Sequence, residues 1–171
     1  PSTIKTILKA LPEDFPAPIV IVQHLEKNFD QGYAEWLNRA SKLSVKLASH
    51  EETVGPGQVI ISPVGVHLVC KCGKFCHEDS PPVLNQKPSV DLLFQTTAEH
   101  YKQKVLGVLL TGMGKDGAAG CKTILDKGGF TIVQDKESSV VFGMPKAAID
   151  TGAASIVLSF EEIPDLLCEL V

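Results

Sequence analysis

Residues 105–135 read VLGVLLTGMGKDGAAGCKTILDKGGFTIVQD. The apolar run 105–110 predicts a strand, helical spacing follows it, and the run 130–133 predicts a second strand. The glycine pair 128–129 ends the helix between them, as glycine commonly does. Because a strand, a helix and a strand at this spacing form a crossover unit, the segment indicates neighbouring parallel strands.

The same alternation extends to both ends of the chain. A helix begins near Pro145, residues 156–158 predict a strand, and a last helix runs through Leu170. Nearer the start, residues 19–23 form a β-branched apolar run typical of a strand buried on both faces, and residues 33–40 have helical spacing. We therefore expect an α/β fold, with a doubly wound, mainly parallel sheet flanked by helices.

An antiparallel portion is expected in the middle of the chain. Residues 45–48, 59–61 and 66–70 predict short strands that are separated by glycine- and proline-containing turns. Residues 74–77 predict a partner for the last of them, so that 66–77 forms a hairpin.

Composition limits the classes of function. The chain has 171 residues, 44% of them hydrophobic, which fits a single domain over residues 1–171. A net charge of −4 with Arg39 as the sole arginine argues against a nucleic-acid partner. No apolar run approaches the length of a membrane span and no signal pattern opens the chain, so we expect a cytoplasmic protein that does not insert into membranes.

Five cysteines in a chain without a secretory pattern are expected to be reduced thiols. Three of them, Cys70, Cys72 and Cys76, have a spacing that resembles half of a zinc site. A hairpin explains this spacing without a metal, because no second pair of ligands completes the site elsewhere. We expect neither a metal nor a cofactor.

Two proton-handling side chains lie at the ends of predicted strands. His24 follows the run 19–23, and Asp116 lies in the turn after the run 105–110. Alone, the aspartate is explained as a cap of the helix that follows it, and the histidine as a structural residue. Together, they are placed to form the imidazole–carboxylate hydrogen bond of a catalytic triad, because such strand ends meet at one edge of the sheet.

The turn 112–117 also matches the dinucleotide-binding pattern G-x-G-x-x-G, with Asp135 near the end of the next strand. Nucleotide binding is therefore an alternative function. Against it, Asp116 lies inside the turn, where its carboxylate would compete with a pyrophosphate for the donors of the helix N-terminus. The turn also lacks the Ser or Thr that follows the lysine of a P-loop.

Four motifs along the whole chain resemble the protein-glutamate methylesterases of bacterial chemotaxis, the CheB-type catalytic domain. They are VQHL at 22–25, KPSVDLLF at 87–94, LLTGMGKDGAAG at 109–120 and VVFGMPKAAI at 140–149. The resemblance implies hydrolysis of glutamate methyl esters on methyl-accepting receptors with release of methanol, deamidation of receptor glutamines, and a Ser-His-Asp triad.

The resemblance also implies roles for residues and partners. His24 matches the general base and Asp116 the residue that orients it. Four residues match segments beside the family's site and are candidates for binding substrate: Met113, Gly114, Gly143 and Met144. The family further implies an N-terminal receiver domain, phosphorylated by the chemotaxis histidine kinase, which residues 1–171 do not contain.

The nucleophile is where this sequence departs from the pattern. The family's serine lies in a Ser-Thr-Gly-Gly turn after the first strand, and both precede the helix that Pro1 begins. We therefore expect the serine upstream of Pro1, and residues 1–171 alone to be inactive. Ser2 is expected to cap the first helix, and Cys121 to be a core thiol. A non-catalytic receptor-binding module is a further alternative.

Overall fold

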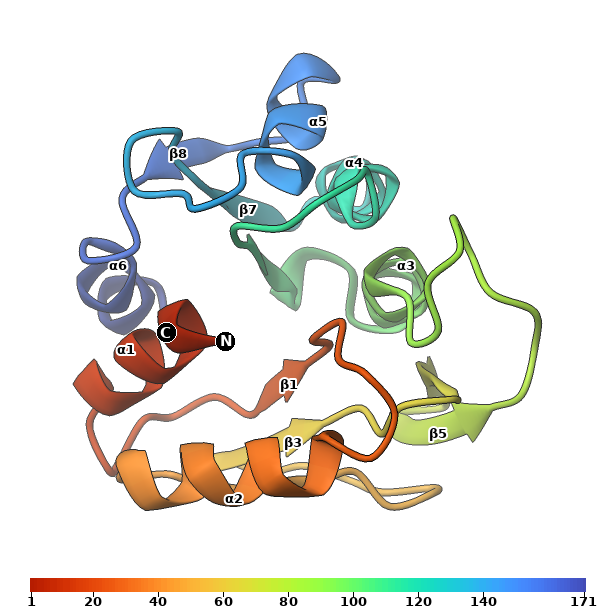
Figure 1. The fold of residues 1–171 in the computed structure, drawn as a ribbon. Coiled ribbons are helices and arrows are strands. Elements are labelled where there is room, and N and C mark those ends of the chain that lie inside the picture. The colour runs from red at the N-terminus through yellow and green to blue at the C-terminus, as the bar shows by residue number, and fades with distance from the viewer.

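The computed structural model describes residues 1–171 as two small parallel sheets, a hairpin and the helices around them (Figure 1). The helices are α1 (Ser2–Ala10), α2 (Asp30–Ala40), α3 (Val90–Tyr101), α4 (Ala118–Asp126), α5 (Met144–Asp150) and α6 (Ile163–Leu170), with a 3-10 turn at Lys102–Lys104. The strands are β1 (Ile19–Ile21), β2 (Ser44–Leu47), β3 (Gln58–Ile61), β4 (His67–Lys71), β5 (Lys74–Glu78), β6 (Leu106–Leu109), β7 (Phe130–Gln134) and β8 (Ile156–Leu158). The expected α/β class and the middle hairpin are confirmed.

The extent of the antiparallel portion was predicted wrongly. Only β4 and β5 pair antiparallel, whereas β2 and β3 pair in parallel in the sheet order β1-β3-β2. The reason is the connection between β2 and β3, residues 48–57, which is long enough to return the chain to the start of the next strand. A tight turn would have forced the antiparallel arrangement.

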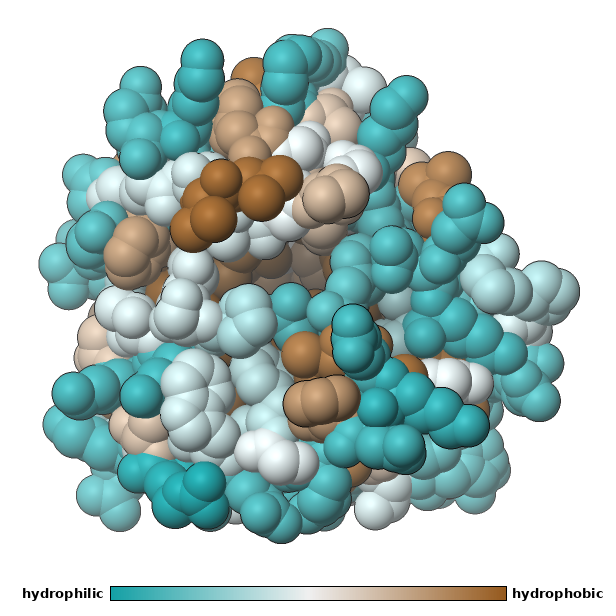
Figure 2. All heavy atoms as spheres, in the orientation of Figure 1, coloured by the Kyte–Doolittle hydropathy of each residue, from teal (hydrophilic) through white to brown (hydrophobic).

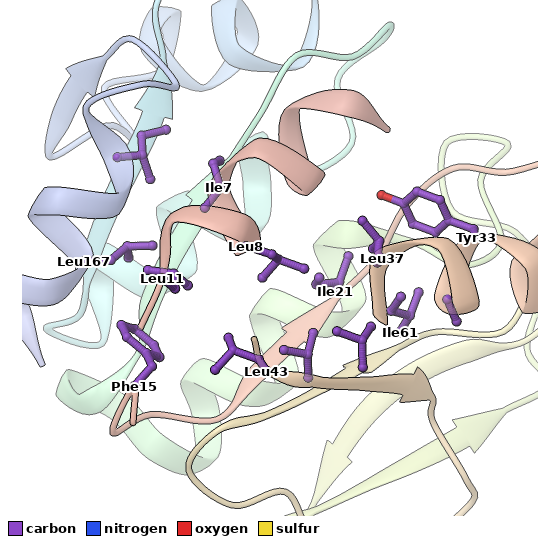
Figure 3. Close-up of a cluster of buried hydrophobic side chains, with 14 of the residues drawn as sticks. Ile7, Leu8, Leu11, Phe15, Ile21, Tyr33, Leu37, Leu43, Ile61 and Leu167 are labelled. Carbon is purple, nitrogen blue, oxygen red and sulfur yellow. The ribbon is translucent and has the colours of Figure 1, made fainter. Parts of the chain in front are cut away.

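The largest apolar cluster joins the N-terminal and C-terminal parts of the chain (Figure 3). Leu11, Leu37 and Ile61, which come from the α1, α2 and β3 regions, are completely buried there, and Leu167 of α6 packs with them. Burying each such side chain contributes about 1.5–3 kcal/mol relative to leaving it exposed. This cluster holds the sheet β1-β3-β2 and helices α1, α2 and α6 together.

A cavity of about 960 Å³ separates the two parallel sheets. It is lined mainly by apolar side chains, including β1 from one sheet and β6 from the other. Each of these strands pairs with a neighbour on one side only, β1 with β3 and β6 with β7. Pro1 also lines the cavity, and the N-terminus lies beside the gap in Figure 1. Figure 2 shows a hollow with apolar residues inside it near the centre of the same face.

Of two serines at the starts of helices, one caps its helix and the other does not. Ser89 caps α3, and its hydroxyl accepts a hydrogen bond from the Leu92 N–H. Ser2 does not cap α1, because Pro1 occupies the cap position and Ser2 is the first helical residue. None of the helices combines the length and the apolar composition that crossing a membrane requires.

Gly120 permits a close approach of α3 and α4. A Cβ added there would lie 2.6 Å from the Phe94 Cβ and 3.2 Å from the Asp91 Cα. Both are rigid parts of α3, so a larger residue would push the two helices apart.

We predict that Gly120→Ala lowers the free energy of unfolding by about 1–3 kcal/mol, despite the better helix propensity of alanine. Gly32→Ala in α2 is the matched control, since nothing lies within 4 Å of a Cβ there. The control is expected to be stabilised by about 0.5–1 kcal/mol. Urea denaturation measures both, and equal stabilisation of the two variants would contradict the close packing of α3 and α4.

Candidate active site

His24 and Asp116 meet although 92 positions separate them in the chain. His24 lies in the loop after β1, Asp116 lies just before α4, and the His24 Nε2 is 2.8 Å from the Asp116 Oδ2. The Asp116 side chain is 1% exposed and that of His24 is 21% exposed. The Nδ1 of His24 makes no hydrogen bond within the chain, so this ring nitrogen is available for proton transfer.

Three further donors from the start of α3 surround the Asp116 carboxylate. Its Oδ1 accepts from the Ser89 hydroxyl at 3.0 Å and from the Asp91 N–H at 2.9 Å, while Oδ2 accepts from the Val90 N–H at 2.7 Å. Taken alone, Asp116 would be explained as a cap of the helix that follows it, α4. The structure shows that it satisfies the N-terminus of α3 instead, while α4 has Gly117 at its N-cap position and no side-chain cap.

These contacts set the protonation state of Asp116. Burial by itself raises the pKa of this carboxyl, because the charged form loses water. The hydrogen bonds from His24, Asp91, Val90 and Ser89 outweigh burial and hold the pKa below its ordinary value. Asp116 is therefore ionised at neutral pH, as the partner of an imidazolium must be.

The turn that precedes Asp116 is held by the neighbouring strand and loop. The side chain of Gln134, completely buried at the end of β7, accepts a hydrogen bond from the Thr111 N–H at 2.7 Å. The Gly112 N–H donates to the Val141 carbonyl at 3.0 Å. Sequence reasoning missed Gln134, although an amide at the end of the apolar run 130–133 was a usable signal, because a buried amide needs partners.

The four residues expected to shape the pocket lie together but differ in exposure. Met113 is 78% exposed, whereas the side chain of Met144 is buried. The N–H groups of Gly143 and Met144 both donate to the Gly112 carbonyl, at 3.1 and 2.8 Å. Gly114 adopts a positive φ of 90°, which favours glycine. The N–H groups of Met113 and Gly114 make no hydrogen bond within the chain, so they can bind a substrate oxygen.

Cys121 lies in the core, as expected. It is completely buried in α4, and burial followed by the nearby charge of Asp91 raises the pKa of its thiol to about 12. A thiol in this state cannot act as a nucleophile at neutral pH.

The start of α4 gives a second argument against binding of a dinucleotide at the turn 112–117. The N–H groups of Gly117 and Gly120, at the start of α4, already donate to the Asp91 carboxylate at 2.9 and 2.8 Å. A pyrophosphate would have to displace a buried carboxylate to reach them.

The cysteine cluster is part of the hairpin. Cys70 and Cys76 are buried free thiols on β4 and β5, and Cys72 is exposed in the turn between them. No group of three or more His, Cys, Asp or Glu side chains is placed to hold a metal ion.

Comparisons with known proteins agree with the sequence motifs. Residues 1–167 match the family model described as CheB methylesterase. The protein-glutamate methylesterase/protein-glutamine glutaminase 2 of Anaeromyxobacter dehalogenans is 46% identical to the chain over 99% of its length. The protein-glutamate methylesterase/protein-glutamine glutaminase 1 of Syntrophus aciditrophicus is 44% identical, also over 99% of the chain. The chain covers 50% and 49% of these relatives, so it spans about half of their length.

A solved structure is similar over nearly the whole chain. The crystal structure of the Thermotoga maritima CheB methylesterase catalytic domain superposes with a TM-score of 0.94 at 43% sequence identity. The match covers 99% of the present chain and 92% of that chain.

We predict that Asp116 makes stability sensitive to acid. Because its folded pKa is depressed, its contribution is present above the unfolded pKa of about 3.9 and is lost as the pH falls through the lower folded value. Asp116→Asn should cost about 2–3 kcal/mol at pH 7 and show a smaller further loss below about pH 4 than the parent.

Asp126→Asn is the control, because this exposed carboxylate at the end of α4 is paired only with Lys122. Denaturant titrations from pH 7 to pH 3 measure all three proteins. An identical acid dependence of the parent and Asp116→Asn would contradict the assignment.

Proposed function

The chain belongs to the CheB methylesterase family, and on this premise we propose that the protein hydrolyses γ-glutamyl methyl esters of methyl-accepting chemotaxis receptors. Methanol is the product, and deamidation of receptor glutamines follows the same chemistry, since the names of the relatives include glutaminase activity. One observation carries the proposal. A partly exposed imidazole is bonded at 2.8 Å to a buried aspartate, and its other nitrogen is free.

The proposed reaction passes through an acyl-enzyme. The His24 Nδ1 takes the proton of a serine hydroxyl as the serine oxygen attacks the ester carbonyl, and the imidazolium is stabilised by Asp116. The same proton then goes to the leaving methoxide, which departs as methanol. Water repeats the sequence on the acyl-enzyme and releases the glutamate carboxylate. The Met113 N–H, in the turn held by Gln134, is a candidate donor to the oxyanion.

We place the nucleophilic serine outside residues 1–171, in a turn upstream of Pro1 that a strand precedes. The cavity between β1 and β6 supports this placement, because each strand has one unpaired edge on it and His24 lines the same cavity. Thr97 lines it too, and its hydroxyl is buried without a hydrogen-bond partner. An added strand would join the two sheets into one and end close to His24.

The proposal extends to the intact protein. Residues 1–171 form the catalytic domain without its first strand and nucleophile turn, and an N-terminal receiver domain, phosphorylated by the chemotaxis histidine kinase, accounts for the remaining half of the relatives' length. The cytoplasm as the compartment of the reaction is part of this proposal, which rests on the membership of the chain in the family. Met113, Gly114, Gly143 and Met144 shape the pocket, with Met113 in contact with substrate and the Met144 N–H supporting the turn through its hydrogen bond to the Gly112 carbonyl.

We predict that His24→Ala, made in the intact protein, lowers the rate of methanol release by about 10²–10⁴-fold, because the general base is lost. His100→Ala is the matched control, since the side chain of this exposed histidine of α3 makes no hydrogen bond within the chain. Its rate should equal that of the parent.

The same assay separates the alternatives. Retained turnover in His24→Ala contradicts the mechanism. A parent protein that binds receptors without releasing methanol supports a binding module, and saturable binding of a nicotinamide dinucleotide supports the nucleotide alternative.

We also predict that the upstream strand protects the edges of the cavity. Hydrogen exchange at the cavity-facing amides of β1 and β6 should be at least about tenfold slower in the intact protein than in residues 1–171, because new ladder hydrogen bonds form. The hairpin β4-β5 serves as an internal control and should exchange equally in both. Equal exchange at β1 and β6 contradicts the placement of the strand.

A further inference from the structure

Asp91 is a second buried carboxylate beside Asp116. It is 4% exposed, at the start of α3, and its Oδ1 accepts hydrogen bonds from the Gly117 N–H at 2.9 Å and the Gly120 N–H at 2.8 Å. Gly117 directly follows Asp116 in the chain. Asp91 therefore holds the piece of backbone from which the Asp116 side chain extends.

The two aspartates act on each other's helices. Asp116 accepts from the Val90 and Asp91 N–H groups at the start of α3, and Asp91 accepts from the Gly117 and Gly120 N–H groups at the start of α4. Each helix N-terminus thus faces a carboxylate of the other helix, a favourable arrangement for both charges. Gly120 makes this reach possible, because a Cβ there would collide with Phe94.

The surroundings of Asp91 leave its charge without a cationic partner. No lysine or arginine forms an ion pair with it. The titratable groups near Asp91 are Asp116 with its partner His24, the Cys121 thiol, and His67. His67 contacts the start of α3, where the Ser89 N–H donates to its Nδ1 at 3.1 Å.

Burial of the Asp91 carboxylate carries an energetic cost, which shows in its raised pKa. Burial raises its pKa, the two amide hydrogen bonds oppose that rise, and the charge of Asp116 adds to it. A neutral side chain with an oxygen in the same place would keep both amide hydrogen bonds at a lower cost of burial.

We propose that Asp91 is a positioning residue of the reaction: it fixes the backbone that carries Asp116, and its charge adds to the field that favours the His24 imidazolium. The inference rests on the proposed function. It goes beyond helix capping, which would require the two hydrogen bonds but not the charge. Asp116 links the two residues, because its carboxylate contacts the His24 ring and accepts a hydrogen bond from the Asp91 N–H.

Two variants in the intact protein separate the hydrogen bonds from the charge. Asp91→Ala removes both, so kcat should fall at least about tenfold while KM changes by less than about twofold, since the loss affects positioning and not binding. Asp91→Asn keeps the accepting oxygen, so its plateau kcat should stay within about threefold of the parent. Its acid limb of kcat/KM against pH should move to lower pH by about half a pH unit, because His24 loses a stabilising negative charge.

Asp126→Asn removes one charge from the exposed end of the same helix and should leave the pH profile unchanged. The midpoint of the His24 imidazole titration, followed by NMR in the same proteins, provides a readout that does not depend on turnover. Should Asp91→Ala fail to fold, Asp91→Asn still decides the matter.

The outcomes are distinct. An unmoved His24 midpoint and pH profile in Asp91→Asn, or an Asp91→Ala protein that folds and turns over like the parent, would overturn the inference. A parent that releases no methanol, with a His24 midpoint that still moves in Asp91→Asn, would overturn the proposed function and leave the positioning of His24 in place.

Discussion

The buried carboxylate of Asp116 is the interaction on which the candidate site depends. An ionised group that is 1% exposed would be prohibitively unstable without compensation. Four donors from two separate parts of the chain compensate it: the His24 ring, and the Ser89 hydroxyl with the two amides that follow it. These contacts therefore keep Asp116 ionised at neutral pH although folding buries it, and the contact with His24 fixes the orientation of the imidazole ring.

The exchange of caps between α3 and α4 extends this constraint to the core. Helices usually satisfy their first N–H groups with a residue of their own chain segment. Here the Asp116 carboxylate accepts from the first N–H groups of α3, and the Asp91 carboxylate accepts from those of α4. If either N-terminus moved, a buried carboxylate would lose its hydrogen-bond donors. Close packing at Gly120 supports the arrangement, which makes the α3-α4 pair a rigid base for the contact between Asp116 and His24.

The cavity between the two sheets is the other organising feature. Two strands that present unpaired edges to an apolar space would invite aggregation if they stayed open. The strand that we propose upstream of Pro1 would satisfy both edges, and the turn after it would lie beside His24. The proposed position of the nucleophile thus rests on the unpaired strand edges that face the cavity.

The sequence by itself determined the α/β class and the central hairpin, and it predicted that His24 and Asp116 meet, because hydrophobic periodicity and strand-end residues are local properties of the chain. It misjudged the direction of β2 against β3, and it gave no sign that Asp116 satisfies the N-terminus of α3. It also missed Gln134 and Asp91 as supports of the site. Only the tertiary structure decided these points, because the partner of a buried polar group is chosen by which distant donors the packed helices bring within about 3 Å, and no local pattern carries that information.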